Sequence, residues 1–458
     1  MVKKATSPAY VLGVGMTKFI KPRGKVDYNE LGYEAGIKAM LDAQITYDDV
    51  DQGVACYVYG DSTCGQRVFY QFGLTQIPIY NVNNNCSTGS TGLAMARTMV
   101  SHGAADCVLV VGFEKMNPGS LQSMYNDRAN PTGLFGTMMA ETRGVTNAPA
   151  PPRCSAMLAL NTKRSTAQQT KTSLKSPGST TNTPSATPTP NSNKNTPLDQ
   201  IMKSPMIHEP LTKLQCCPTS DGGAAAVIVS QEFLDARPHL KENAILIAGQ
   251  TLASDTDQVY NQSSIDLMGF GMSRYAARTA IAEAGVNVKD IKVCELHDCF
   301  SANEMITIDA LELSEPGKAH EMVRKGDITY GGKMVINPSG GLISKGHPLG
   351  ATGIAQCAEL VWHLRGWANN RLIDGTNAAL QHNLGLGGAV VVTVYKRADG
   401  KVAAAVPSDV VGKVNKLGYN PAVEARGFTA AQAKSVISQK HSSEYAVADA
   451  QERVLARF

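Results

Sequence analysis

A cysteine and a histidine occupy equivalent places in two similar glycine-rich segments of this 458-residue chain. The segments are Asn85–Leu93 and Gly346–Ile354, and aligning them matches Cys86 with His347, together with two glycines and a threonine of each. A thiol becomes a strong nucleophile when a neighbouring imidazole takes its proton. The repeat therefore predicts that Cys86 and His347 meet where two similar halves face each other, as a nucleophile and its base.

Each residue of this pair is expected at the start of a helix. Apolar residues from Leu93 to Val100 follow the Cys86 segment, and Pro348 suits the first turn of the second helix. Unpaired N–H groups at a helix start would lower the pKa of the Cys86 thiol, and the Cys86 N–H could donate to an oxyanion. The alternatives are a small buried cysteine and a histidine that only bonds a loop carbonyl.

A second histidine and thiol stand in the segment His297–Phe300, after a short apolar strand. Alternate residues of an extended segment share a face, so His297 and Cys299 should point the same way. Such a pair suits acid/base work on a carbon acid. Half of a zinc site is the alternative, although no matching Cys/His pair stands elsewhere at ligand spacing.

Two further features carry weaker signals. Core packing is the expectation for Cys216 and Cys217, which precede a run of small residues. The turn Asn383–Gly388 lacks the lysine of a phosphate-binding P-loop, and its backbone N–H groups could instead complete an oxyanion hole.

The elements that would position these residues also repeat. A helix, an acidic turn and a strand in Tyr33–Val58 recur in Tyr275–Leu296. Each copy continues through its glycine-rich segment and a helix to a β-branched strand, at Cys107–Val111 or Ala389–Val394. Alternating helices and strands of this length indicate stacked βαβ units with largely buried sheets.

Two regions lie outside this repeat. Residues 161–197 are rich in Ser, Thr, Pro, Asn and Lys and contain no acidic residue, which predicts a disordered insertion. The tail after Lys396 is expected to pack on the surface of the second half. It should contain a helix from Thr429 to Ile437, with Gln432 completing a capping box.

Length and composition limit the classes of function. The chain can bury a large core in two or three domains. A net charge of +4 is too small to indicate nucleic-acid binding, and no apolar run of about 18 residues predicts a membrane span. Ten cysteines without a CxxC pair or a secretory signal indicate reduced thiols inside the cell.

Taken together, the motifs resemble the thiolase superfamily. Asn85–Gly89 is similar to its nucleophile loop, Gly346–Pro348 to its GHP motif, and Asn337–Gly341 also fits. Most thiolases carry Asn-Glu-Ala-Phe in place of His297–Phe300, and a catalytic cysteine in a Cys-x-Gly loop where this chain has Asn383–Gly385. HDCF without that cysteine resembles the pattern of sterol-carrier-protein-2 type thiolases.

The resemblance covers roughly residues 8–160 and 198–397. It implies an α/β fold in which two repeated βαβ halves form a five-layer α/β/α/β/α sandwich with an inserted loop domain. The implied parts are an N-terminal half (1–115 and 216–240), a loop domain (116–215, with the insertion at 161–197), a C-terminal half (241–397) and an extension (398–458). Because only this short extension follows the thiolase body, a sterol-carrier domain and lipid transfer are not expected.

The resemblance also implies a reaction, the CoA-dependent cleavage of a 3-ketoacyl-CoA to acetyl-CoA (or propionyl-CoA) and a shortened acyl-CoA, as in fatty-acid β-oxidation. Cys86 would attack the 3-keto carbonyl while His347 takes its proton, and Cys299 would protonate the enolate and later deprotonate CoA. His297 and His347 would form one oxyanion hole, and the N–H groups of Cys86 and Gly385 the other. Coenzyme A is expected as a co-substrate, with no permanently bound cofactor and no metal.

Two alternatives keep this fold: a condensing enzyme that works in the biosynthetic direction, and a non-catalytic acyl-CoA or lipid-binding member. The second is expected to have lost a reactive position, and this chain keeps all four. The resemblance further implies a homodimer, while residues 161–197 leave the acyl-chain preference open. The ending Ala456–Phe458 has the form of a peroxisomal address without its usual leucine, so a mitochondrion and a peroxisome-like organelle both stay open.

Overall fold

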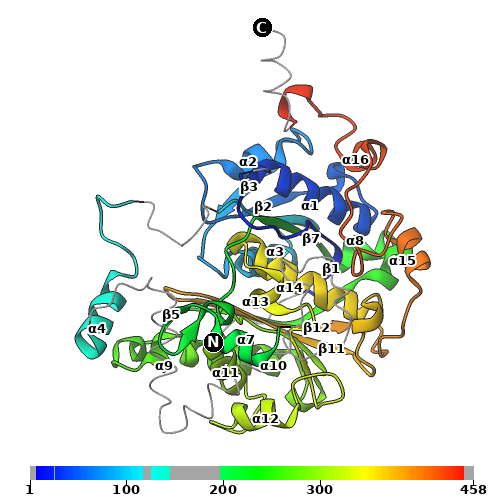
Figure 1. Ribbon diagram of the computed structural model, residues 1–458. Helices are drawn as coiled ribbons and strands as arrows, with labels where there is room; N and C mark the ends of the chain where they lie inside the picture. The colour runs from blue at the N-terminus through cyan, green and yellow to red at the C-terminus, as the bar shows by residue number, and fades with distance from the viewer. Residues whose placement is uncertain (1–6, 25, 117–124, 145–195, 448–458) are drawn as a thin grey trace.

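The computed structural model describes residues 7–24, 26–116, 125–144 and 196–447 (Figure 1). Within these residues one ten-stranded sheet has the order β10-β9-β11-β12-β8-β1-β7-β4-β2-β3. Its strands are β1 (Ala9–Met16), β2 (Gln52–Cys56), β3 (Ile79–Val82), β4 (Cys107–Glu114), β7 (Gly222–Ser230), β8 (Ile245–Ala253), β9 (Val293–Glu295), β10 (Val335–Ile336), β11 (Ala378–Gly385) and β12 (Ala389–Arg397). A separate hairpin pairs β5 (Met206–His208) with β6 (Leu211–Thr212).

The large sheet consists of two halves with the same topology. In the first half the order is β3-β2-β4-β7-β1, and in the second it is β10-β9-β11-β12-β8. In each half the first three strands are parallel to one another. The fourth strand, β7 or β12, is antiparallel to both of its neighbours. The halves join through β1 and β8, where Tyr10 pairs with Leu246 and Val11 with Ile245. The predicted internal repeat is therefore confirmed, and the junction makes the two sheets continuous.

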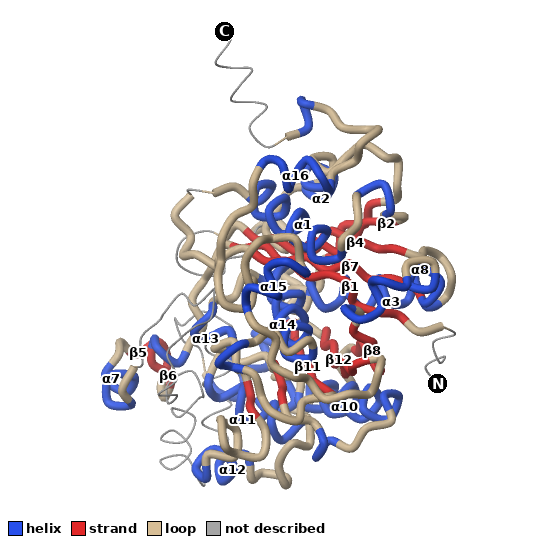
Figure 2. The backbone as a smooth tube through the Cα atoms, turned by 90° about the vertical axis from the view of Figure 1, so that its right-hand side faces the viewer, coloured by secondary structure: helices blue, strands red, loops and turns tan. Residues whose placement is uncertain are grey.

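Helices form three layers around the two half-sheets, as Figure 2 shows from top to bottom. α1 (Tyr28–Ala43) and α2 (Cys64–Phe69) cover the outer face of the first half. α10 (Phe270–Ala284), α11 (Ser301–Ala310) and α12 (Ala319–Lys325) cover that of the second. α3 (Thr88–Ser101) and α14 (Leu349–Leu364) lie between the halves, and every residue of α14 is buried. The predicted five-layer α/β/α/β/α arrangement is confirmed.

The strand sequences follow from burial on both faces. In β4, Val108 and Val110 pack into the central layer, whereas Leu109 and Val111 pack into the outer layer of the first half. Successive side chains of a strand point to opposite faces, so a strand between two helical layers needs apolar residues at every position. This explains the unbroken β-branched runs in the sequence.

The central helices touch through glycines of the two repeated segments. A Cβ atom on Gly353 of α14 would overlap Ser90 of α3, and one on Gly89 would lie 2.7 Å from the carbonyl oxygen of Gly350. Any side chain at these positions would push the helices apart. The shared glycines thus bring together the starts of α3 and α14, where Cys86 and His347 stand.

Smaller helices surround this core: α4 (Gly133–Arg143), α7 (Leu198–Lys203), α8 (Gln231–Asp235), α9 (Ser264–Leu267), α13 (Gly341–Lys345), α15 (Ser408–Val414) and α16 (Ala430–Val436). Most of the predicted insertion 161–197 lies outside the described residues, and the domain boundaries stay a prediction. None of the helices in the described part of the chain is both long and apolar enough to cross a bilayer.

The tail helix α16 has the predicted cap but not the predicted position. Thr429 and Gln432 form the expected capping box. However, Ala433 and Val436 join the outer apolar cluster of the first half, next to α1. The carbonyl oxygen of His441 then accepts the N–H of Leu74 at 2.7 Å. The prediction that the tail packs on the second half is confirmed for its first part, where the N–H of Ala403 donates to Thr376 and the Asn420 side chain donates to Trp367. It was wrong for the tail helix, whose two apolar residues complete the cluster over α1.

Candidate active site

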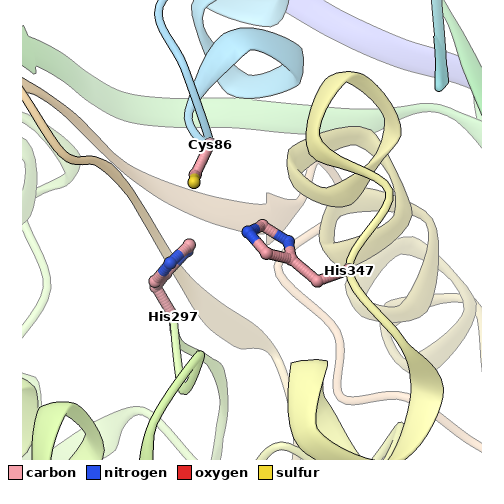
Figure 3. Close-up of side chains that lie close together, drawn as sticks. All are labelled: Cys86, His297 and His347. Carbon is pink, nitrogen blue, oxygen red and sulfur yellow. The ribbon is translucent and has the colours of Figure 1, made fainter. Parts of the chain in front are cut away.

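Three reactive side chains from different elements meet between the halves (Figure 3). Cys86 comes from the loop between β3 and α3, His297 follows β9, and His347 directly precedes Pro348 at the start of α14. The Cys86 sulfur and one nitrogen of each ring all lie within 4.8 Å of one another. The ring centroids of His297 and His347 are 5.1 Å apart at an interplanar angle of 83°. The structure therefore brings three of the sequence-predicted residues together, and their catalytic roles stay predictions.

The hydrogen bonds of His347 fix which ring nitrogen carries its proton. Its Nδ1 lies 2.7 Å from the hydroxyl oxygen of Thr352, and that hydroxyl donates to the carbonyl oxygen of Pro348 at 2.9 Å. The hydroxyl must therefore accept from Nδ1–H, which leaves Nε2 unprotonated. Nε2 is buried and has no hydrogen-bond partner among the described residues. Burial, and then His297, hold the pKa of His347 well below its usual value, so the ring is neutral and can take a proton.

His297 has a different partner. The side-chain nitrogen of Asn383, in β11, lies 3.1 Å from Nδ1 of His297. The backbone N–H of His297 donates to Nδ1 of His382 at 3.4 Å. Burial lowers the pKa of His297 to about 3, so this ring is also neutral.

The pKa of the Cys86 thiol differs from the prediction. Burial, and then the charge of Glu114, raise the pKa of Cys86 to about 12, while the backbone N–H groups of Cys86 and Leu386 act in the opposite direction. The prediction of a lowered pKa was wrong, because these N–H groups do not offset desolvation and the nearby acid. Cys86 is half-buried rather than part of a sealed core. It rests as a thiol and needs a base when it reacts.

The loop Asn337–Gly341 and the start of α13 hold the segment His297–Phe300 in place through two hydrogen bonds. The buried Asp298 carboxylate accepts the N–H of Leu342, in α13, at 2.6 Å. The side-chain oxygen of Asn337 accepts the N–H of Leu296 at 2.8 Å. Burial raises the pKa of Asp298 to about 7. Asp298 therefore ties the backbone between His297 and Cys299 to the start of α13.

Cys299 and its neighbours show a contact that the sequence did not reveal. The N–H of Cys217 donates to the carbonyl oxygen of Cys299 at 2.9 Å. Thr219 forms a parallel bridge with His347, whose N–H donates to Ser220 Oγ at 3.3 Å. Burial, and then the neighbouring cysteines Cys217 and Cys86, hold the pKa of Cys299 well above its usual value.

The short segment 216–220 therefore runs between the two histidine loops. Cys216 packs against the apolar residues Leu211 and Phe300, as predicted, but both Cys216 and Cys217 are half-buried and lie where this segment meets the two histidine loops. No motif in the sequence signalled this, because the contact depends on pairing with two distant loops. Thr352 and Asn383 were missed for a similar reason, although both belong to segments that had been singled out.

Gly385 lies against the nucleophile loop. A Cβ atom on it would overlap the carbonyl oxygen of Asn84 and lie 2.7 Å from Ser87 Oγ. The next residue, Leu386, accepts a hydrogen bond from the Asn85 side chain at 2.9 Å, and its N–H acts on the thiol. The N–H groups of Cys86 and Leu386 thus lower the pKa of the thiol, and the oxyanion-hole role of the Gly385 N–H stays a prediction.

The same three residues are also the group in the described chain that could hold a metal ion, as a Cys/His/His set. The contact with Asn383 works against this use. An amide nitrogen donates to Nδ1 of His297, so Nε2 keeps its proton, and a metal would require that proton to be lost. The arrangement favours acid/base chemistry.

Comparison with known proteins agrees with this fold. Residues 9–146 match the family profile "Thiolase, N-terminal domain", and residues 253–397 match "Thiolase C-terminal domain-like". The chain belongs to the thiolase family.

Two relatives and two solved structures show the range of similarity. Sterol carrier protein 2 of Gallus gallus is 49% identical over 393 residues, which cover 84% of this chain and 71% of that protein. Acetyl-CoA acetyltransferase of Methanothermobacter thermautotrophicus is 31% identical, covering 84% of this chain and 99% of its own. An Ltp2-ChsH2(DUF35) aldolase matches with a TM-score of 0.71 at 21% identity, over 86% of this chain and 98% of that one. Human mitochondrial 3-ketoacyl-CoA thiolase in complex with CoA matches with a TM-score of 0.63 at 18% identity, over 86% and 99%. The two structures support the fold.

Proposed function

We propose that this protein is a 3-ketoacyl-CoA thiolase, which cleaves a 3-ketoacyl-CoA with CoA through an acyl-Cys86 intermediate. The observation that carries the proposal is the unpartnered Nε2 of His347, grouped with the Cys86 sulfur and His297 within 4.8 Å. A resting thiol beside a neutral imidazole is suited to proton transfer during attack. The acetyl-CoA acetyltransferase relative supports the same class of acyl transfer.

The first half-reaction forms the acyl-enzyme. The Cys86 sulfur attacks the 3-keto carbon and its proton moves to Nε2 of His347. The bond between C2 and C3 then breaks, its electron pair forms the enolate of acetyl-CoA, and the Cys299 thiol protonates C2. Nε2–H of His297 and protonated His347 stabilise the enolate oxygen. A thioester on Cys86 remains.

The second half-reaction returns the enzyme to its starting state. The Cys299 thiolate takes the proton of the CoA thiol, and the CoA sulfur attacks the thioester carbon. The tetrahedral intermediate expels the Cys86 sulfur, which recovers its proton from His347. In this proposal the N–H groups of Cys86 and Gly385 stabilise the intermediate's oxygen, and the N–H of Leu386, which acts on the Cys86 sulfur, adds a third donor.

Replacing Cys86 tests the proposal most directly. Cys86→Ala should abolish CoA-dependent cleavage of acetoacetyl-CoA, whereas Cys64→Ala, in the outer helix α2, should retain it. Unchanged turnover in Cys86→Ala would contradict the proposal.

Replacing Cys299 tests the division of roles. Cys299→Ala should still become acylated at Cys86 but turn over slowly, because the enolate and CoA lack their proton partner. Mass spectrometry of the intact protein detects the adduct. A variant without the adduct would assign Cys299 a role in the first attack instead.

The proposal includes coenzyme A as co-substrate, no resident cofactor, and a homodimer as the working unit. It also includes residence in a mitochondrion or a peroxisome-like organelle, which cell fractionation would separate. The same site can run the reverse condensation. Incubation with acyl-CoA alone, without free CoA, would reveal any 3-ketoacyl product.

A further inference from the structure

Asn383 is a fully buried amide on β11, and its oxygen has no hydrogen-bond partner among the described residues. Its oxygen lies against α14, where a Cβ atom on Gly353 would approach it to 2.5 Å. Its nitrogen lies 3.1 Å from Nδ1 of His297. Gly353 therefore leaves room for this amide to reach the histidine.

The contact determines where His297 carries its proton. An amide nitrogen has two N–H groups and no lone pair to share, so it can only donate. Nδ1 of His297 must then accept, and a neutral imidazole has one N–H to place. That N–H falls on Nε2, the ring atom on the side away from Asn383.

The opposite assignment holds for His347. Its Nδ1 donates to Thr352, so its Nε2 has a free lone pair. The two rings thus offer one donor and one acceptor to the same space beside Cys86. Thiol attack needs the acceptor, and a developing oxyanion needs the donor.

We propose that Asn383 is a positioning residue that fixes His297 as the Nε2–H tautomer, and so makes His297 the oxyanion donor beside the base His347. The inference rests on the proposed function for its kinetic consequence. Its structural consequence, the tautomer of His297, can be measured in the absence of any turnover.

Nitrogen NMR of protein labelled at its nine histidines is the direct measurement. We expect an unprotonated Nδ1 for His297 and an unprotonated Nε2 for His347, with signals assigned by loss in His297→Asn and His347→Asn. Asn383→Asp keeps the size of the side chain but accepts from Nδ1–H, so the His297 proton should appear on Nδ1. A wild-type His297 that carries its proton on Nδ1 would overturn the inference.

Kinetics provide the second measurement. Asn383→Leu and Asn383→Asp should both lower kcat by roughly 10- to 100-fold with little change in KM, because a donor aimed at the oxyanion contributes that much or more. The matched control is Gln381→Met, two residues earlier on the same face of β11, which bonds Gly353 and Ser90 but neither active-site histidine. It should leave both tautomers unchanged, and thermal unfolding checks that each variant folds.

The outcomes separate the two proposals. If Cys86→Ala abolishes turnover while the Asn383 variants keep the wild-type kcat and the wild-type tautomer, the role of Asn383 is wrong and the thiolase proposal stands. If the wild-type protein does not turn over, the NMR experiment still decides the tautomer.

Discussion

Glu114, the last residue of β4 in the first half, accepts the backbone N–H of Gly350 in the second half at 2.9 Å. The same carboxylate accepts the N–H of Tyr59 at 2.8 Å and that of Val58 at 3.2 Å. It is fully buried, and its charge is the second cause of the raised Cys86 pKa. One acid thus ties the first half to the helix that follows His347 and opposes formation of the Cys86 thiolate.

Glu114 should make stability depend on pH. Burial raises the pKa of Glu114 from 4.5 to about 7. Because the folded protein holds this proton more tightly than the unfolded chain, its contribution to stability is complete below pH 4.5 and is lost as the pH rises through about 7. In Glu114→Gln the free energy of unfolding should vary less across that range. Denaturant titrations at several pH values measure it, and parallel curves for both proteins would refute the assignment.

The thiol state of Cys86 predicts its reactivity with iodoacetamide. With a pKa of about 12, the rate of alkylation at Cys86 should keep rising with pH and show no plateau near pH 8. Glu114→Gln should speed alkylation at a fixed pH, because it removes a charge that raises the pKa. Peptide mass spectrometry follows Cys86, and Cys86→Ala identifies its peptide. A plateau with a midpoint below pH 8 would instead indicate a resting thiolate–imidazolium pair.

Thr352 should act through His347. Thr352→Val keeps the shape of the side chain but leaves Nδ1–H of His347 buried without an acceptor, which costs about 1–3 kcal/mol. The rate of Cys86 acylation should fall roughly 10- to 100-fold. Thr352→Ser retains the hydroxyl and should keep most of the activity. Single-turnover acylation measures both, and equal rates for the serine and valine variants would exclude the hydrogen bond from the mechanism.

Most of the fold could be predicted from the internal repeat in the sequence. The segments Asn85–Leu93 and Gly346–Ile354 predicted two similar halves because helix contacts between them require glycine at matching places, and such a requirement leaves a pattern. The HDCF segment was visible for a similar reason, since its chemistry depends on residue type.

The features of the site that could not be predicted from the sequence depend on distant residues and on burial. The segment 216–220 gains its place by pairing with two loops about 80 and 130 residues away, so its residues have no local signature. The Cys86 pKa was predicted from its place at a helix start, but in the structure burial of the thiol and then Glu114, on β4, decide it. The Asn383 and Thr352 contacts likewise need the positions of ring nitrogens.

Gly385 should be required for the shape of the nucleophile loop. In Gly385→Ala the new methyl group would overlap the carbonyl oxygen of Asn84 and displace the loop before Cys86. We expect a loss of stability of about 1–3 kcal/mol and a larger loss of activity. Gly271→Ala, in α10, is the control because a Cβ atom there meets nothing within 4 Å. Activity retained in Gly385→Ala would show that the loop can adjust.

The proposed homodimer should form along β3. Among the described residues β3 ends the sheet and pairs on one side, with β2, so its other edge can add a strand from a second copy. Tyr80 is 40% exposed on this strand, which leads within four residues to Cys86. Tyr80→Asp would bring like charges together across a two-fold axis and should shift the protein to monomers with reduced activity. Tyr275→Asp, on the outer helix α10 and 53% exposed, is the matched control and should stay dimeric. Sedimentation equilibrium measures both, and a dimer that persists in Tyr80→Asp would place the interface elsewhere.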